Sequence, residues 1–209
     1  GMVIEGLAKR RKIFVSEADF QFALAWEIQS QYPEAEIRLE YCPTEGDSSM
    51  RIDILVILNG GLYPIELKHL TAKLDIMVEG ERFIVKNQAA QDLGRYDYLK
   101  DIVRLETLAS ALPRFKRGYA VLLSNDPNYW SQPKRANTCD ADFRIHEGVI
   151  KTGHLDWAPR TGDGTKIDRE KPHELRGKYE MKWNNFSRIN DSRAGVFRFV
   201  CGEVNKLGL

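Results

Sequence analysis

The feature that most constrains the fold is a pair of extended segments joined by Asn59-Gly60. Residues 50–58 form an almost continuous apolar run, and residues 62–70 form a second extended segment. Asn-Gly between two apolar runs is the strongest short-range signal for a two-residue hairpin turn, because both central residues tolerate a positive φ. The sequence therefore predicts an antiparallel hairpin whose first strand is too apolar to lie at a sheet edge.

The turn also predicts the register of the hairpin. If Leu58 pairs with Gly61, Asp53 falls opposite Glu66, and Lys68 shares their face because side chains alternate along a strand. The opposite, core-facing side then holds Ile52, Ile54, Ile65 and Leu67. Pro64 removes one ladder hydrogen bond and can shift this register through a bulge.

A pair of carboxylates in this arrangement is electrostatically unfavourable. Side chains directly opposite lie roughly 5 Å apart, and at an effective dielectric of about 20 their repulsion is on the order of 3 kcal/mol. Lys68 offsets part of this repulsion, and a divalent cation bridging Asp53 and Glu66 offsets more, since Mg²⁺ accepts oxygen ligands. The alternative interpretation is a solvated charged face on an edge hairpin.

Helices and further strands are expected on both sides of the hairpin. Ser16 opens a helix in a capping-box pattern with Asp19, and Pro33 stops it. A strand is expected at 35–42, a possible one at 83–85, a helix from about 88 to 110, and a buried strand at 118–123. The order helix, three strands, helix, strand thus occupies residues up to 126, which predicts an α/β mixed sheet flanked by helices.

The pattern becomes irregular after residue 126. Residues 127–195 carry Gly, Pro, Asn and Asp throughout, and a final strand is expected at 196–200. We expect one domain over 1–209, with a core at 16–126 and an irregular C-terminal elaboration at 127–209. Trp130, Trp157 and Trp183 are expected to anchor the elaboration in the core, the alternative being a platform on which bases stack.

Composition restricts the function classes without selecting one. The formal net charge is +1 and charged residues make up 29% of the 209 residues, which excludes a strongly basic protein that coats DNA. Three dispersed cysteines predict free thiols in a reducing compartment. No signal-peptide pattern or membrane-spanning apolar run is visible, so we expect a cytoplasmic protein without a membrane partner.

The residues of the hairpin resemble a known family. The segment Arg51-Ile52-Asp53-Ile54, the Asn59-Gly60 turn, and Ile65-Glu66-Leu67-Lys68 are similar to the D…(D/E)xK motif of the PD-(D/E)xK nuclease superfamily. This resemblance covers residues 16–126 and implies a restriction-endonuclease-like fold with an αβββαβ core. It also implies that Asp53, Glu66 and the main-chain carbonyl of Leu67 hold Mg²⁺, with Mn²⁺ substituting, and that Lys68 activates water or stabilises negative charge.

Two helices are expected to complete the site. Glu17 lies at the end of the core-facing stripe of the first helix, where its carboxylate can reach a metal. The alternative is that it only stabilises the helix through a favourable interaction with the helix dipole. Glu27 is the second candidate for a metal ligand from this helix. In the second helix, Gln88 extends the apolar stripe of Leu99 and Ile102 toward the site. The family often places a glutamine there, with Gln91 as the second choice, although polar residues are also ordinary at a helix start.

These observations predict a metal-dependent nuclease that hydrolyses phosphodiester bonds, in DNA more than RNA. One competing hypothesis is an inactive nucleic-acid-binding domain of the same fold, and another is an interaction protein whose acid pair is incidental. The basic runs at 9–12 and 114–117 are candidate phosphate contacts or solvated faces. The oligomeric state is left open, with a dimer possible.

Overall fold

The computed structural model describes residues 2–43 and 50–206. Within them, a six-stranded mixed sheet has the order β1-β2-β3-β6-β10-β9, in which β3 and β6 are parallel and the other neighbours antiparallel. Its strands are β1 (Glu36–Tyr41), β2 (Ile52–Leu58), β3 (Gly61–Leu70), β6 (Arg117–Ser124), β9 (Trp183–Arg188) and β10 (Val196–Asn205).

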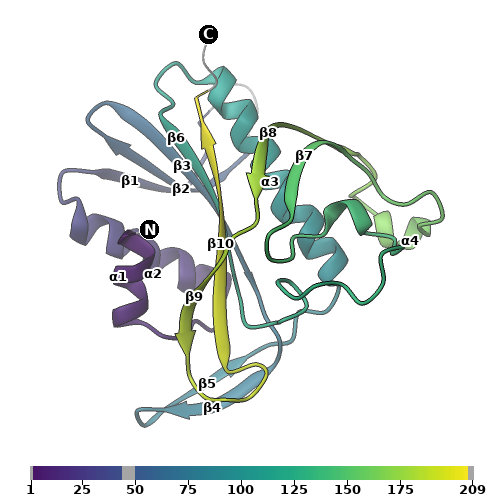
Figure 1. The fold of residues 1–209 in the computed structure, drawn as a ribbon. Helices are drawn as coiled ribbons and strands as arrows, with labels where there is room; N and C mark the ends of the chain where they lie inside the picture. The colour runs from purple at the N-terminus through teal and green to yellow at the C-terminus, as the bar shows by residue number, and fades with distance from the viewer. Residues whose placement is uncertain (1, 44–49, 207–209) are drawn as a thin grey trace.

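Helices cover both faces of this sheet, which gives three layers (Figure 1). On one face, α1 (Met2–Arg10) and α2 (Glu17–Gln31) pack on one apolar cluster, which includes Ile54, Val56 and Ile65. On the other face, α3 (Gln91–Ala111) packs on a second cluster that also takes in residues of the C-terminal elaboration. The mixed α/β architecture agrees with the sequence-based expectation.

The predicted hairpin and its register are confirmed at the turn. Leu58 pairs with Gly61, and the pairing continues to Ile54 and Ile65 without a bulge at Pro64. Asn59 and Gly60 have φ values of 49° and 75°, and two consecutive positive φ values are what this class of tight turn requires. Ser16 is likewise the N-cap of α2, where its Oγ accepts a hydrogen bond of 3.1 Å from the Asp19 N–H.

The second helix begins later than expected. It starts at Gln91, and the main chain of Gln88 instead donates to the Thr71 carbonyl at 2.7 Å. The Gln88 side chain also binds Thr71, accepting from its N–H at 2.8 Å. Ala90 then adopts φ 68°, outside the helical region, so the helix cannot extend back to Gln88.

Several elements were not predicted from the sequence. In the N-terminal part these are α1 and the strand β4 (Leu74–Val78). β4 pairs with β5 (Glu81–Val85), which contains the possible strand expected at 83–85. In the elaboration they are the 3₁₀ helix η1 (Ala141–Phe143), β7 (Ile150–Leu155), α4 (Asp163–Lys166) and β8 (His173–Glu180). β9 was also missed, while β10 starts at the expected Val196 and runs on to Asn205. Trp157 and Trp183 are buried, as expected of core anchors, whereas Trp130 is half-buried and packs against the same core cluster.

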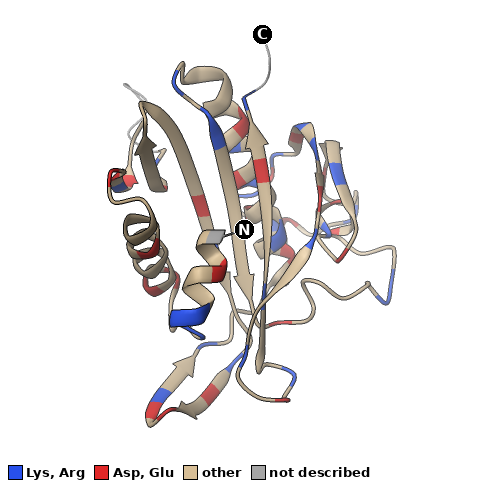
Figure 2. Ribbon diagram, turned by 60° about the vertical axis from the view of Figure 1, so that its left-hand side comes forward, with Lys and Arg blue, Asp and Glu red and all other residues tan. Residues whose placement is uncertain are grey.

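The surface carries charges of both signs. Lysine, arginine and acidic residues are interspersed along the helices and connecting segments (Figure 2). No helix within the described residues has the length and apolar character to cross a membrane.

A candidate acidic site where the hairpin opens

The candidate site lies where β2 and β3 separate. Regular pairing stops at Ile54 and Ile65, one residue short of Asp53 and Glu66. Instead, Oδ2 of Asp53 accepts a hydrogen bond of 2.6 Å from the Leu67 N–H. The carboxylate thus takes the place of a main-chain acceptor, so the expected regular cross-strand pair of Asp53 and Glu66 is not formed.

The opening also changes which face Ile52 occupies. Ile52 was expected beside Ile54 on the core-facing side of the hairpin. It belongs instead to the apolar cluster around α3, whereas Ile54 and Leu67 belong to the cluster around α2. The alternation of faces therefore breaks at Asp53, because the strand leaves its partner there and can turn.

Glu66 is the most deeply buried acid of the site. Its residue exposure is 1%, and neither carboxylate oxygen has a hydrogen-bond partner. Among the described residues its ion-pair partner is Arg104, with Oε1 lying 3.2 Å from the guanidinium. Burial first, and then the neighbouring Asp101 carboxylate, raise the pKa of Glu66 to about 9. A buried carboxylate without hydrogen bonds is costly unless it keeps a proton or meets a cation.

Lys68 lies between β3 and α3. Its Nζ is 2.9 Å from Oδ2 of Asp101 and donates to the Leu67 carbonyl at 3.1 Å. Burial disfavours the ammonium, but the attraction and hydrogen bonding of Asp101 outweigh burial, so the pKa of Lys68 is raised. Lys68 is therefore a fixed positive charge at neutral pH, not a proton acceptor.

Asp101 and Arg104 are site residues that the sequence analysis missed. Both come from α3, where their side chains form an ion pair of 3.3 Å one turn apart. Arg104 thus bridges Asp101 and Glu66, and it also donates to the Arg51 carbonyl. The spacing of Asp101 and Arg104 was the one sign of this pair in the sequence. It is ambiguous, because an acid and a base three residues apart are also common on the solvent-exposed face of a helix.

Helix α2 contributes Glu17 and Gln21. Oε2 of Glu17 accepts a hydrogen bond of 2.9 Å from the His69 N–H, next to Lys68 in the chain. Desolvation of the carboxyl, opposed by Lys68, raises the pKa of Glu17. Gln21, which was not predicted, donates to the Asp53 carbonyl and to Oε1 of Glu40, both at 2.7 Å. It therefore holds the strand in place at the point where the hairpin opens.

The other candidates lie elsewhere. Gln88 binds Thr71, and Gln91 donates to Oδ2 of Asp126 at 2.8 Å. Neither glutamine has a hydrogen bond or ion pair with Asp53, Glu66 or Lys68 in the described part of the chain. Glu27, the second choice to Glu17, pairs with Arg10 at 3.4 Å. His69 points away from the site, as expected, with its ring against Phe14 and Phe20.

The acidic side chains of the site outnumber the basic ones. Glu17, Asp53, Glu66 and Asp101 contribute four negative charges when ionised, against two positive charges from Lys68 and Arg104. The fully ionised site thus carries a net charge of −2, and the Glu66 oxygens have no hydrogen bond to lose. No three His, Cys, Asp or Glu side chains among the described residues are arranged to hold a metal. The described residues thus offer a cation carboxylate oxygens, which are ligands that Mg²⁺ accepts, but no preformed set of three such side chains.

No protein-family model matches the chain, and no curated protein matches it significantly.

Proposed function

We propose that the protein is a metal-dependent nuclease that hydrolyses phosphodiester bonds, with DNA ahead of RNA as the substrate. The observation that carries this proposal is the meeting of Asp53, Glu66 and Lys68 at the opening of the hairpin, beside Asp101 and Arg104. Acids with an unbalanced negative charge next to a fixed ammonium are suited to holding a divalent cation and a phosphate group together.

The arrangement of elements supports a restriction-endonuclease-like core as part of the proposal. Between residues 17 and 124 the main elements follow the order α2, β1, β2, β3, α3, β6, with the β4-β5 hairpin inserted before α3. The return through α3 makes β6 parallel to β3, so α3 lies against the face where Lys68 meets Asp101. This is the αβββαβ order that the resemblance to the PD-(D/E)xK superfamily implies.

Each residue of the site has a role in the proposal. Asp53, Glu66 and the Leu67 carbonyl would hold Mg²⁺, with Mn²⁺ able to substitute; when bound, such an ion supplies an acidified water and neutralises phosphate charge. Lys68 keeps its proton and stabilises the negative charge that develops on the phosphate.

The remaining side chains prepare this arrangement. Asp101 holds the Lys68 ammonium, and Arg104 balances the charge of Glu66. Glu17 accepts a hydrogen bond from the His69 main chain and lies on the exposed side of the cluster, where it can orient water.

Cleavage assays test the proposal. Supercoiled plasmid and labelled duplex, single-stranded and RNA substrates are incubated in Mg²⁺, Mn²⁺ or EDTA with wild type, Asp53→Asn and Glu66→Gln. Asp191→Asn serves as the control, because its side chain is 97% exposed and its ion pair is with Arg188 of β9, outside the hairpin. We expect metal-dependent cleavage by wild type and the control only. Cleavage that survives in Asp53→Asn at the wild-type rate contradicts the proposal.

The same assay separates the competing functions. Binding of nucleic acid without cleavage in any metal indicates a binding domain that has lost turnover. Absence of both binding and cleavage at low salt indicates an interaction protein with an incidental acid pair.

A further inference from the structure

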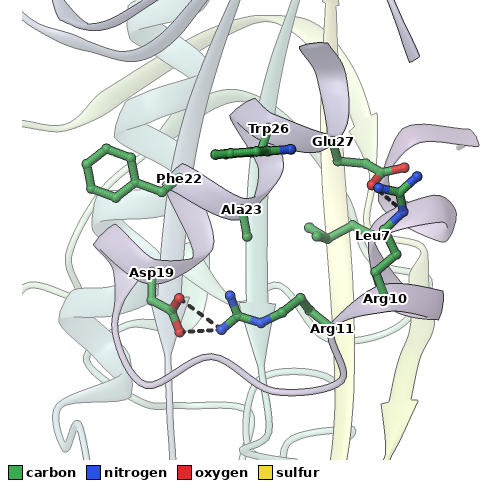
Figure 3. Close-up of a pocket in the computed structure, with 8 residues that line it drawn as sticks. All are labelled: Leu7, Arg10, Arg11, Asp19, Phe22, Ala23, Trp26 and Glu27. Carbon is green, nitrogen blue, oxygen red and sulfur yellow. Dashed lines mark hydrogen bonds and ion pairs between the residues drawn. The ribbon is translucent and has the colours of Figure 1, made fainter. Parts of the chain in front are cut away.

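Two aromatic side chains stand exposed on α2, away from the acidic site. Phe22 and Trp26 are 62% and 77% exposed, and they lie one helical turn apart on the same side of the helix (Figure 3). With Leu7 and Ala23 they line a shallow hollow of about 270 Å³ between α1 and α2. Tryptophan side chains are usually mostly buried in folded proteins. Exposed aromatic rings grouped beside a hollow are therefore typical of a surface that contacts another molecule.

Two ion pairs line the hollow, Arg10 with Glu27 and Arg11 with Asp19, and in each pair the arginine is the more exposed partner (Figure 3). Arg10 and Arg11, from the basic run 9–12 at the end of α1, line the same hollow. Their partners Glu27 and Asp19 have side-chain exposures of 4% and 24%, against 63% and 42% for the arginines. The acids therefore lie beneath the guanidinium groups, and a ligand approaching from solvent meets the positive charges first.

Lys9 and Lys12 extend this charge beyond the hollow. Both are exposed, and Lys12 reaches Glu79 at 3.4 Å, in a pair whose two side chains are 51% and 81% exposed. Such an exposed pair is weak and is easily exchanged for a phosphate contact. The basic run 9–12 and the aromatic pair Phe22 and Trp26 are 10 or more residues apart in the sequence. In the folded chain they lie on one surface.

We propose that this surface, formed by Phe22, Trp26 and residues 9–12, binds a single-stranded segment of nucleic acid. Unpaired bases can stack on the two rings while lysine and arginine contact the phosphates, which is the combination used for single strands. A duplex cannot offer its base faces to these rings, because they are already stacked within the helix. The inference rests on the proposed function and deepens it by naming a substrate with a single-stranded portion.

The position of the surface suits a strand that also reaches the acidic site. Glu17 begins α2, and Phe22 and Trp26 follow five and nine residues later. With a rise of 1.5 Å per residue, the rings lie about 8 and 14 Å from Glu17 along the helix axis. They point to the other side of the helix, so a strand that reached both places would have to pass around the N-terminal end of α2.

Tryptophan fluorescence provides the direct test. Trp157 and Trp183 are buried and Trp130 is half-buried, so Trp26 is the tryptophan most open to a ligand. A short oligo(dT) is titrated in EDTA against wild type, Trp26→Ala, Phe22→Ala and the control Ile167→Ala, whose exposed side chain lies in the elaboration. We expect quenching in wild type. Affinity is followed in all four proteins by the anisotropy of a labelled oligo(dT), and binding should be about tenfold weaker for each aromatic truncation but unchanged in the control. A blunt duplex of equal length should quench far less.

The outcomes are distinguishable from those of the cleavage assay. If wild type cleaves DNA but Trp26→Ala and Phe22→Ala bind oligo(dT) as tightly as wild type, this inference is wrong while the proposed nuclease function stands. If oligo(dT) binds through Trp26 but nothing is cleaved in any metal, the inference stands and the proposed function fails. If Trp26→Ala instead converts a dimer to a monomer without changing oligo(dT) binding, a second copy occupies the surface and the inference is overturned.

Discussion

The ammonium of Lys68 lies 2.9 Å from the carboxylate of Asp101, which ties the central strand β3 to helix α3. The two residues are 33 positions apart, and both are largely buried. Asp101 therefore keeps Lys68 charged and fixes its direction at the opening of the hairpin. This contact changes what substitution of Lys68 should do, because it gives the residue a structural role beside its proposed chemical one.

Lys68→Ala should abolish cleavage and also destabilise the fold. Removing the ammonium leaves Asp101 with Arg104 as its remaining partner, and breaking a buried pair costs about 3–5 kcal/mol. A double-mutant cycle with Lys68→Ala and Asp101→Asn, measured by urea unfolding, should give a coupling energy of about 1–3 kcal/mol. Additive effects of the two substitutions, or a Lys68→Ala variant that still cleaves, would contradict this account.

Metal binding should stabilise the wild type through Asp53. At about 100 times the dissociation constant, a bound ion adds roughly 2.7 kcal/mol of stability, which corresponds to an increase of about 5–10 °C in the thermal midpoint of a protein of this size. Asp53→Asn keeps an oxygen acceptor for the Leu67 N–H but removes the charge, so the increase should largely disappear. Differential scanning fluorimetry in Mn²⁺ and EDTA measures this. An equal shift in wild type and Asp53→Asn, with Asp191→Asn as the matched control, would place the metal elsewhere.

Lys151 should make stability depend on pH in the alkaline range. The side chain is 6% exposed and donates to the Asp142 carbonyl at 2.6 Å, and burial lowers its pKa to about 8 from an ordinary value of 10.5. The folded state therefore releases this proton at lower pH than the unfolded state does. The cost of burying the ammonium, on the order of 3 kcal/mol, is fully present below pH 8 and is lost as the pH rises toward 10.

Comparison with Lys151→Met isolates this effect. Urea unfolding at pH 7 and pH 10 should show that wild type gains stability relative to the variant as the pH rises. A difference between the two proteins that stays constant over this range would mean that the ammonium is not buried at a cost.

Glu106 should hold the C-terminal elaboration on α3. Its carboxylate is 2% exposed and accepts hydrogen bonds from the N–H groups of Arg176 and Gly177, at 3.0 and 2.7 Å, and from the Tyr179 hydroxyl at 2.7 Å. In Glu106→Gln an amide NH₂ group replaces one of the two carboxylate oxygens and faces at least one of these N–H or O–H donors, so the substitution should lower the free energy of unfolding by about 2–4 kcal/mol. The exposed Glu180→Gln serves as the control. Equal stability of the two variants in equilibrium unfolding would show that these hydrogen bonds contribute little.

Local signals in the sequence were sufficient for the hairpin and for the start of α2. Asn59-Gly60 and Ser16 act through their own backbone neighbours, so their effects can be read without knowledge of distant residues. The same holds for the register as far as Ile54 and Ile65. The predicted register fails at Asp53, because its carboxylate accepts a hydrogen bond from the Leu67 N–H and the regular pairing ends there. The alternation of apolar and polar residues does not predict this contact.

The residues that were missed depend on contacts across the fold. Asp101 can be buried because Lys68 and Arg104 neutralise its charge. Helical periodicity alone predicts that such a charged residue lies on the surface. β8 is different, since buried His173, Leu175 and Tyr179 alternate with exposed charged residues along it. That period of two was present in the sequence but was obscured by the surrounding Gly, Pro and Asn residues.

The central claim is that Asp53 and Glu66 together hold a divalent cation, and a crystal soaked in Mn²⁺ tests it most directly. Anomalous scattering locates manganese independently of the protein model. The account predicts one strong anomalous peak bonded to carboxylate oxygens of both residues, and loss of that peak in Asp53→Asn. Clear manganese peaks elsewhere in the crystal, with none between Asp53 and Glu66, would contradict it.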